Sequence, residues 1–186
     1  GYKVSREVTP YAGLVYDIDA LHSLYGSWTS IFNPQSAVDR HGVLLDPVTG
    51  INMEAGAKGE YFGGALNASA AVFRIVQKNL ATSLPLTQCG PGLLSCSEAA
   101  GEVRSDGFEL SVSGALTPRW QMSAGFTYNT AEYAKAQGSN AAGARYAAER
   151  PSRLLRLSTS YRLSDAWRVG GALRAQNHIY KTNSAI

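Results

Sequence analysis

The sequence predicts an all-β protein: about eight long antiparallel strands that run up and down and form a portion of a transmembrane β-barrel. Three observations lead to this fold class. Apolar and polar residues alternate with a period of two, the alternating segments are long, and the connections between them are short and long in turn. Strands of roughly 9 to 11 tilted residues can cross a bilayer, whereas strands of soluble domains are usually shorter.

The clearest element is a long hairpin between Leu45 and Asn79. Its first limb, residues 51–61, has apolar or small residues at every odd position and mostly polar residues at the even ones, and its second limb alternates from Leu66 to Val72. The return at residues 62–64 contains two glycines, which readily adopt the positive φ of a tight turn. A long hairpin with one apolar and one polar face is typical of a transmembrane barrel.

Two strands are predicted before this hairpin. Residues from Val4 to Tyr16 are rich in β-forming side chains, and residues 22–32 follow after a short polar return at residues 17–21. Pro34 ends the second strand, because proline has no amide proton for the sheet. The segment from Gln35 to Gly50 is longer and polar and is closed by Asp46-Pro47 and Gly50, so it is predicted to be a loop.

Four strands are predicted after the central hairpin, in two further hairpins. The predicted elements are a loop from Thr82 to Gly101, strands at 108–116 and 120–129 joined at 117–119, a loop from Gln137 to Pro151, and strands at 155–163 and 167–176 joined at 164–166.

The connections fall into two classes that alternate along the chain. In an up-and-down sheet, alternate connections lie at the same edge, so all short turns are expected at one rim and all long loops at the other. Short periplasmic turns and long extracellular loops are the arrangement of bacterial outer-membrane barrels. A soluble β-sandwich, the alternative, would have shorter strands and turn signals every 8 to 12 residues or so.

Composition excludes several classes of protein. The 186 residues carry a net charge of +3, and their 17 basic residues are scattered, so a nucleic-acid interface is not expected. No window reaches the roughly 18 apolar residues of a membrane helix, and the N-terminal residues lack the apolar core of a signal peptide. A membrane crossing would therefore use strands.

Charged side chains lie on the strand faces opposite the apolar residues. They are Glu54, Lys58, Arg156, Arg162, Arg168 and Arg174. In a wide barrel these side chains would line a wet lumen, and in a soluble sheet they would face solvent. Aromatic residues near predicted strand ends are expected to form interfacial girdles. These are Trp28, Tyr61, Trp120, Tyr133, Tyr161, Trp167 and Tyr180.

Four runs of the chain resemble TonB-dependent siderophore receptors of the ferric-hydroxamate, coprogen and pyoverdine type. The runs are SLYGSWTSIFNPQ at 23–35, LDPVTGINMEAGAKGEYFGGALNASAAVFRIVQKNLA at 45–81, RSDGFELSVSGALTPRWQMSAGFTYNTAEY at 104–133 and RPSRLLRLSTSYRL at 150–163. The most specific parts are Glu54-x-Gly56-x-Lys58-Gly59 and Arg104-Ser105-x-Gly107-x-Glu109-Leu110.

This resemblance implies a fold, a location and partners. Such receptors are barrels of about 22 strands with a plugged lumen, in the outer membrane of Gram-negative bacteria. They bind a ferric siderophore as substrate, contact outer-membrane lipid and draw energy from the TonB complex through an N-terminal region. We expect residues 1–186 to be an internal or late portion of the barrel domain, since the sequence shows no plug, no TonB box and no final strand ending in an aromatic residue. No cofactor and no catalytic residue is expected.

The outer rim holds the residues that could touch a ligand, although the sequence does not identify a ligand set. Phe32, Asn33, Tyr133 and Tyr146 are candidates, and packing within the loops is the more common role for such residues. Cys89 and Cys96 flank Gly-Pro-Gly in the second long loop. In a compartment outside the cytoplasm, this spacing predicts a local disulfide, and a metal site with only two thiols is poorly supported.

Two other classes of function stay open from the sequence. A small closed eight-stranded barrel with an adhesin or structural role fits the strand count. A rim enzyme would need a nucleophile beside a base, and no motif places Ser36 or Ser139 next to His41 or His178.

Overall fold

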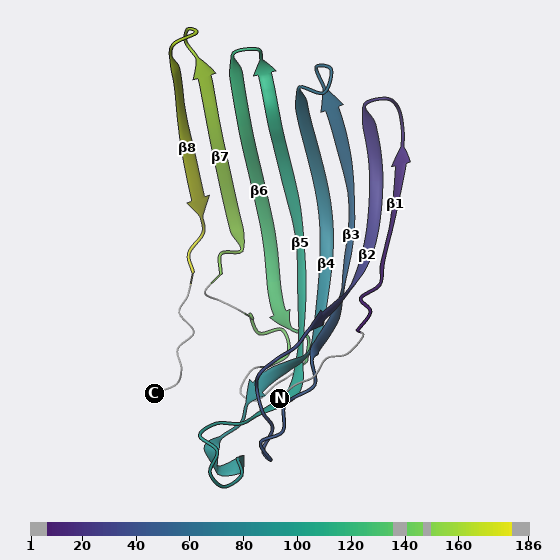
Figure 1. Cartoon of the computed structure of the whole chain (residues 1–186), viewed down its shortest axis with the longest axis vertical. Coiled ribbons are helices and arrows are strands. Elements are labelled where there is room, and N and C mark those ends of the chain that lie inside the picture. The colour runs from purple at the N-terminus through teal and green to yellow at the C-terminus, as the bar shows by residue number, and fades with distance from the viewer. Residues whose placement is uncertain (1–6, 136–140, 147–149, 180–186) are drawn as a thin grey trace.

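The computed structural model describes residues 7–135, 141–146 and 150–179. These residues form a single antiparallel sheet of eight strands whose spatial order is the order of the chain (Figure 1). The predicted fold class, an up-and-down all-β sheet, is therefore confirmed. No helix in the described part of the chain is long and apolar enough to span a membrane.

The strands are long, and one short 3₁₀ helix (η1) lies in a loop. The elements are β1 Tyr11–Asp17, β2 His22–Asn33, β3 Val48–Tyr61, β4 Leu66–Ser83, η1 Leu86–Gln88, β5 Ser97–Thr117, β6 Trp120–Tyr133, β7 Arg153–Arg162 and β8 Arg168–Gln176. The strands of the central hairpin, β3 and β4, have 14 and 18 residues, which is well beyond the length usual in soluble domains.

Short and long connections lie at opposite ends of the sheet, as the sequence predicts. The four short turns, between β1 and β2, β3 and β4, β5 and β6, and β7 and β8, gather at the upper end in Figure 1. The three long connections, which begin after Asn33, Ser83 and Tyr133, leave from the lower end. We call these ends the short-turn end and the long-loop end.

The central turn uses three consecutive residues with positive φ. Gly63 has φ +67° and Gly64 has φ +84°, which agrees with the predicted role of these glycines. Phe62 also has φ +57°, an uncommon conformation for a bulky residue. The backbone N–H of Ala65 donates to the carbonyl of Phe62 at 3.4 Å and so closes the turn.

Several predicted boundaries are wrong. The loop predicted from Gln35 to Gly50 ends before Val48, the first residue of β3. The first strand begins at Tyr11, not at Val4, and residues 4–6 lie outside the described part of the chain. The carbonyl of Pro10 still accepts the N–H of Ser30, but Pro10 has no amide proton to continue the ladder.

The second long loop is also shorter than predicted, because β4 and β5 extend beyond the regular pattern. Thr82 pairs with Glu98 and Ser83 with Ser97, beyond register shifts around Leu80. Asn79 has φ +62° at this irregularity. A bulge breaks the period of two, so the alternation in the sequence ends although the pairing continues. The loop predicted from Thr82 to Gly101 is therefore reduced to residues 84–96.

The register aligns side chains of the same kind across the strands, so the whole sheet has one apolar face and one polar face. On the apolar face, Ala55 lies opposite Val72, Val72 opposite Phe108, and Phe108 opposite Tyr128. The sheet is a single layer, so the apolar face has no second layer against it; Leu14 is 75% and Leu173 55% exposed. A contiguous exposed apolar surface of this kind is expected against lipid and not against water.

Most of the predicted girdle aromatics share the apolar face. Trp28 lies opposite Met53, Tyr61 opposite Leu66, and Trp120 opposite Tyr161. Tyr133 does not, because it lies opposite Val103 on the other face, so its assignment to the girdle is wrong. Trp167 lies in the turn between β7 and β8, and Tyr180 lies outside the described residues.

We predict that Gly56→Ala destabilises the barrel. A Cβ at Gly56 would lie 2.6 Å from the carbonyl oxygen of Ala70 and 2.7 Å from Cε1 of Tyr25. Such overpacking is expected to lower the free energy of unfolding by roughly 1 to 3 kcal/mol. The measurement is urea unfolding of the complete protein in detergent. Gly171→Ala is the control, because its Cβ would meet no atom within 4 Å. An equal loss of unfolding free energy in both variants would contradict the prediction.

Candidate functional site

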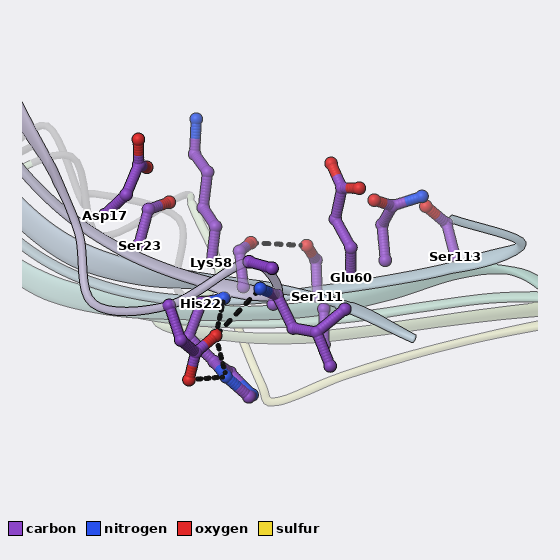
Figure 2. A pocket seen from close by; sticks show the side chains of 14 residues that line it. Asp17, His22, Ser23, Lys58, Glu60, Ser111 and Ser113 are labelled. Atoms are coloured by element: carbon purple, nitrogen blue, oxygen red, sulfur yellow. Dashed lines mark hydrogen bonds and ion pairs between the residues drawn. The ribbon is translucent and has the colours of Figure 1, made fainter. Parts of the chain in front are cut away.

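The polar face of the sheet is the candidate site. Cross-strand pairs place the predicted charged residues on it: Lys58 lies opposite Ser23 and Ser69, and Arg156 opposite Gly125 and Arg174. Figure 2 shows Asp17, Ser23, Lys58, Glu60 and Ser113 projecting to the same side of the sheet. The predicted lumen-facing residues thus do share one face.

An open hollow of about 650 Å³ lies at the short-turn end of the sheet (Figure 2). Most of its lining comes from the polar face, including Lys58, Glu60 and the hydrogen-bonded pair Ser69 and Ser111, whose Oγ atoms are 2.8 Å apart. His22 projects to the opposite side, where its Nδ1 lies 2.9 Å from Oδ1 of Asp19. The hollow is polar and open, which suits contact with water or with polar protein segments.

Tyr25, Glu54 and Lys58 form a fixed cluster on the polar face. The Tyr25 hydroxyl donates a hydrogen bond to Oε1 of Glu54 at 2.6 Å, and the Nζ of Lys58 lies 4.8 Å from the centre of the Tyr25 ring. Gly56, opposite Tyr25, leaves room for the ring to lie across β3. The sequence identifies Glu54 and Lys58 but not Tyr25, because the contact depends on the pairing of β2 with β3.

Charge is segregated across the polar face. Carboxylates lie on the strands from β1 to β5, for example Glu54 and Glu109. The β7–β8 hairpin instead carries two pairs of directly opposed arginines, Arg156 with Arg174 and Arg162 with Arg168. Like charges directly opposite each other destabilise a sheet, so this half of the face is suited to anionic groups in the lumen.

A cavity of about 280 Å³ lies at the long-loop end of the polar face. It is lined by Gln77, Ser105 and Asn129 from the strands and by Tyr146 and Pro151 from the third long loop, among others. The side-chain oxygen Oδ1 of Asn129 is buried without a hydrogen-bond partner in the described part of the chain. The cavity therefore offers an aromatic ring and the polar residues Gln77 and Ser105 to a polar organic ligand.

The four candidate contact residues at the rim separate into two groups. Tyr133 and Tyr146 meet edge to face with ring centres 5.4 Å apart, and the N–H of Tyr146 donates to the carbonyl of Ala131 at 2.8 Å. Phe32 lies opposite Thr49 on the apolar face, whereas Asn33 lies on the polar face opposite Val48. Of the candidates, Tyr146 lines the cavity.

The first two long loops are joined at the long-loop end. The N–H groups of Gly90 and Ser97 donate to the carbonyls of Arg40 and Val38, at 2.9 and 2.8 Å. Cys89 and Cys96 form a disulfide with their Cα atoms 5.6 Å apart. Cys96 is 2% exposed, and each cysteine is next to a residue that bonds the first loop, so the disulfide stiffens the second loop where it contacts the first.

Asp39 organises the first long loop. Its Oδ1 accepts the backbone N–H groups of His41 and Val43 at 2.8 and 2.9 Å. The bond from Val43 is the main reason that the pKa of the Asp39 carboxyl lies below its ordinary value, and the bond from His41 adds to it.

The described residues contain no group of three or more His, Cys, Asp and Glu side chains that could hold a metal ion. Of the residues considered for a rim enzyme, His41 lies in the first long loop and His178 follows β8, and no contact joins them in the described part of the chain. Ser139 lies outside the described residues.

Comparison with known proteins identifies relatives along nearly the whole chain. The family profile described as TonB dependent receptor-like, beta-barrel matches residues 1–185. The ferric-pyoverdine M114 receptor PbuA of Pseudomonas sp. (strain M114) is 37% identical over 181 residues, which are 95% of this chain and 21% of that protein. The ferripyoverdine receptor of Pseudomonas aeruginosa is 35% identical over 184 residues, covering 95% of this chain and 22% of the relative.

Solved structures show the same arrangement of strands. The alcaligin outer membrane receptor FauA from Bordetella pertussis has a TM-score of 0.74 and 37% identity, over 94% of this chain and 30% of that one. FpvA of P. aeruginosa, solved with heterologous pyoverdines, has a TM-score of 0.78 and 35% identity, over 90% of this chain and 22% of its own. The chain spans about a fifth of the length of the curated relatives that it matches.

We predict that Cys89 and Cys96 are protected from thiol reagents in the mature protein. Peptide mapping after alkylation should show both cysteines unlabelled before reduction and labelled after it, because the disulfide occupies both sulfurs. Protease cleavage within residues 84–96 should rise on reduction. Labelling of either cysteine without reductant would contradict the structure of this loop.

We predict that the first long loop loosens in acid. A lowered carboxyl pKa means that the ionised form stabilises the folded loop at pH values above the ordinary pKa of about 4, and this contribution is lost as the pH falls through the lowered value. Hydrogen-exchange protection of His41 and Val43 should decline in this range and be low at every pH in Asp39→Asn. Asp46→Asn, in the same loop, is the control and should leave both amides protected.

Proposed function

Because this chain belongs to the TonB-dependent receptor β-barrel family, we propose that it is part of the barrel wall of an outer-membrane receptor that imports a ferric siderophore with energy from the TonB complex. The observation that carries this proposal is the 37% sequence identity to a ferric-pyoverdine receptor over 95% of the chain. The family consists of receptors and transporters, and the described residues of the rim give no support to an enzymatic role.

The two faces of the sheet suit a transport barrel. The apolar face, with Val72, Phe108 and Leu173, would contact lipid, and the polar face would line the lumen. We propose that residues 1–186 are one portion of the barrel domain, and that further strands and a plug come from other parts of the receptor. The open sheet supports this, since β1 and β8 are its two edges among the described strands.

The long-loop end is the proposed place of recognition. A siderophore satisfies the ferric ion with its own oxygen atoms, so the protein must recognise an organic shell through aromatic contacts and hydrogen bonds. The cavity beside Asn129 and Tyr146 offers both kinds of group. At the same end of the sheet, the first two long loops are joined by hydrogen bonds to the carbonyls of Arg40 and Val38, and the disulfide stiffens the second loop, which would keep this part of the rim in one shape.

The alternative of a small closed barrel is not supported. Closure of eight strands would require β1 to pair with β8, and no such pairing occurs among the described residues. The relatives are also several times longer than this chain.

The test is iron uptake by the complete receptor. A host that lacks its own receptors should grow on a ferric pyoverdine or hydroxamate as iron source when it carries the complete gene, and should fail when TonB is deleted. Uptake that persists without TonB would contradict the proposal. We also expect the protein to fractionate with the outer membrane, and its abundance and uptake activity to rise when an iron chelator is added to the medium.

Tyr146→Ala tests the place of recognition. Loss of an aromatic contact should weaken siderophore binding roughly two- to tenfold without loss of folded receptor. Tyr161→Ala is the matched control, because Tyr161 lies on the apolar face at the short-turn end and should leave binding unchanged. Equal affinities for wild type and Tyr146→Ala would exclude this cavity from the binding site.

A further inference from the structure

The apolar face carries an arginine cluster near its long-loop end. Nε of Arg74 lies 2.5 Å from Oδ1 of Asp106, and Nε of Arg104 lies 3.0 Å from Oδ2 of the same carboxylate. We call Arg74, Arg104 and Asp106 the arginine cluster. Two guanidinium groups share one carboxylate, so these three side chains have a net charge of +1; the carboxylate of Glu132 lies on the same face, opposite Arg104.

The register shows that the cluster belongs to the lipid side of the sheet. Arg74 lies opposite Met53 on one neighbour and Asp106 on the other, and it is two residues from Val72 on the same face. Arg104 lies opposite Val76. Charged side chains on the lipid face of a barrel are unfavourable near the middle of the bilayer and become tolerable only near its interfaces.

The position along the strand puts the cluster at an interface. Eight residues separate Arg74 from Leu66, the first residue of β4 after the short turn. With a rise of about 3.3 Å per residue and a tilt of about 40°, this separation spans roughly 20 Å of an apolar band that is about 25 Å tall. Arg74 therefore lies about 5 Å inside the boundary on the long-loop side, and Arg104, opposite Val76, lies roughly at the boundary itself.

The two boundaries of the apolar face differ in chemistry. At the short-turn end the boundary carries the aromatic side chains Tyr61, Trp120 and Tyr161. At the long-loop end, arginines outnumber carboxylates. Besides the cluster, Arg153 lies over the ring of Tyr128 at 5.9 Å, and Glu132 lies opposite Arg104 on the same face.

The exposure of the cluster leaves it free to bind. The side chains of Arg74 and Arg104 are 53% and 50% exposed, and Asp106 is 34% exposed. Each guanidinium has five N–H donors in a planar fork that matches phosphate oxygens, and one shared carboxylate cannot occupy the donors of both. The remaining donors lie at the depth of lipid headgroups.

We propose that Arg74 and Arg104 bind the phosphate group of an anionic lipid in the leaflet on the long-loop side, with Asp106 holding the two guanidinium groups together. This inference rests on the membrane placement of the family and is independent of the substrate that the receptor imports. Lipid bound at this site would fix the barrel at its outer boundary and order the base of the long loops.

The test is lipid binding by the complete receptor in detergent micelles. Native mass spectrometry during a titration with phosphatidic acid should show binding that Arg74→Gln/Arg104→Gln weakens roughly 30-fold, since each arginine near a charged membrane surface contributes roughly a fivefold factor. Arg156→Gln/Arg174→Gln is the matched control. It removes the same charge from two directly opposed arginines of the polar face and should change binding less than twofold.

Wild-type receptor provides a second measurement that needs no variant. Diacylglycerol, which differs from phosphatidic acid by the phosphate alone, should bind far more weakly. Inorganic phosphate should not displace the lipid, because it lacks the acyl chains that contact the apolar face; displacement would identify a free-phosphate site and overturn the proposal. If the two lipids bound equally well, or if the two double variants lost equal affinity for phosphatidic acid, the cluster would be only an ion pair of the sheet.

Discussion

The pairing of each strand with its neighbours is the constraint on which the rest of the structure depends. A sheet that faces lipid must satisfy its backbone N–H and C=O groups internally, and the uninterrupted order from β1 to β8 does so for every strand between the two edges. Because side chains alternate, the same pairing also decides which residues meet lipid and which line the lumen. A slip of one residue would bring Lys58 to the lipid side.

The polar face has side chains that are fixed against the wall and leave the space beside it open. Tyr25 lies across Gly56 and is held by Glu54, so a large ring is fixed against the wall and does not fill the lumen. The opposed arginines of β7 and β8 leave one half of the wall electropositive, while carboxylates occupy the other half. A wall of this kind can hold polar protein segments and anionic groups at different places along the same conduit.

The long-loop end is built differently on its two sides. Toward the lumen, hydrogen bonds from Gly90 and Ser97 join the first two loops, the disulfide stiffens the second, and the third loop contributes Tyr146 to a small cavity. Toward the lipid, arginines replace the tyrosine and tryptophan residues that border the other end of the sheet. This asymmetry matches an outer membrane, whose two surfaces present different chemistry to the same protein.

The sequence by itself determined the fold class, the rims and the faces of most strands, because a period of two and the length of each connection are local properties. It placed Glu54 and Arg156 on one face correctly and assigned Tyr133 wrongly. Only the tertiary structure decided which side chains of different strands lie beside one another. The bulge near Leu80 let β5 begin at Ser97, and the register brought Arg74 to Asp106. Cross-strand register joins residues that are 32 positions apart, and alternation within a single strand carries no information about it.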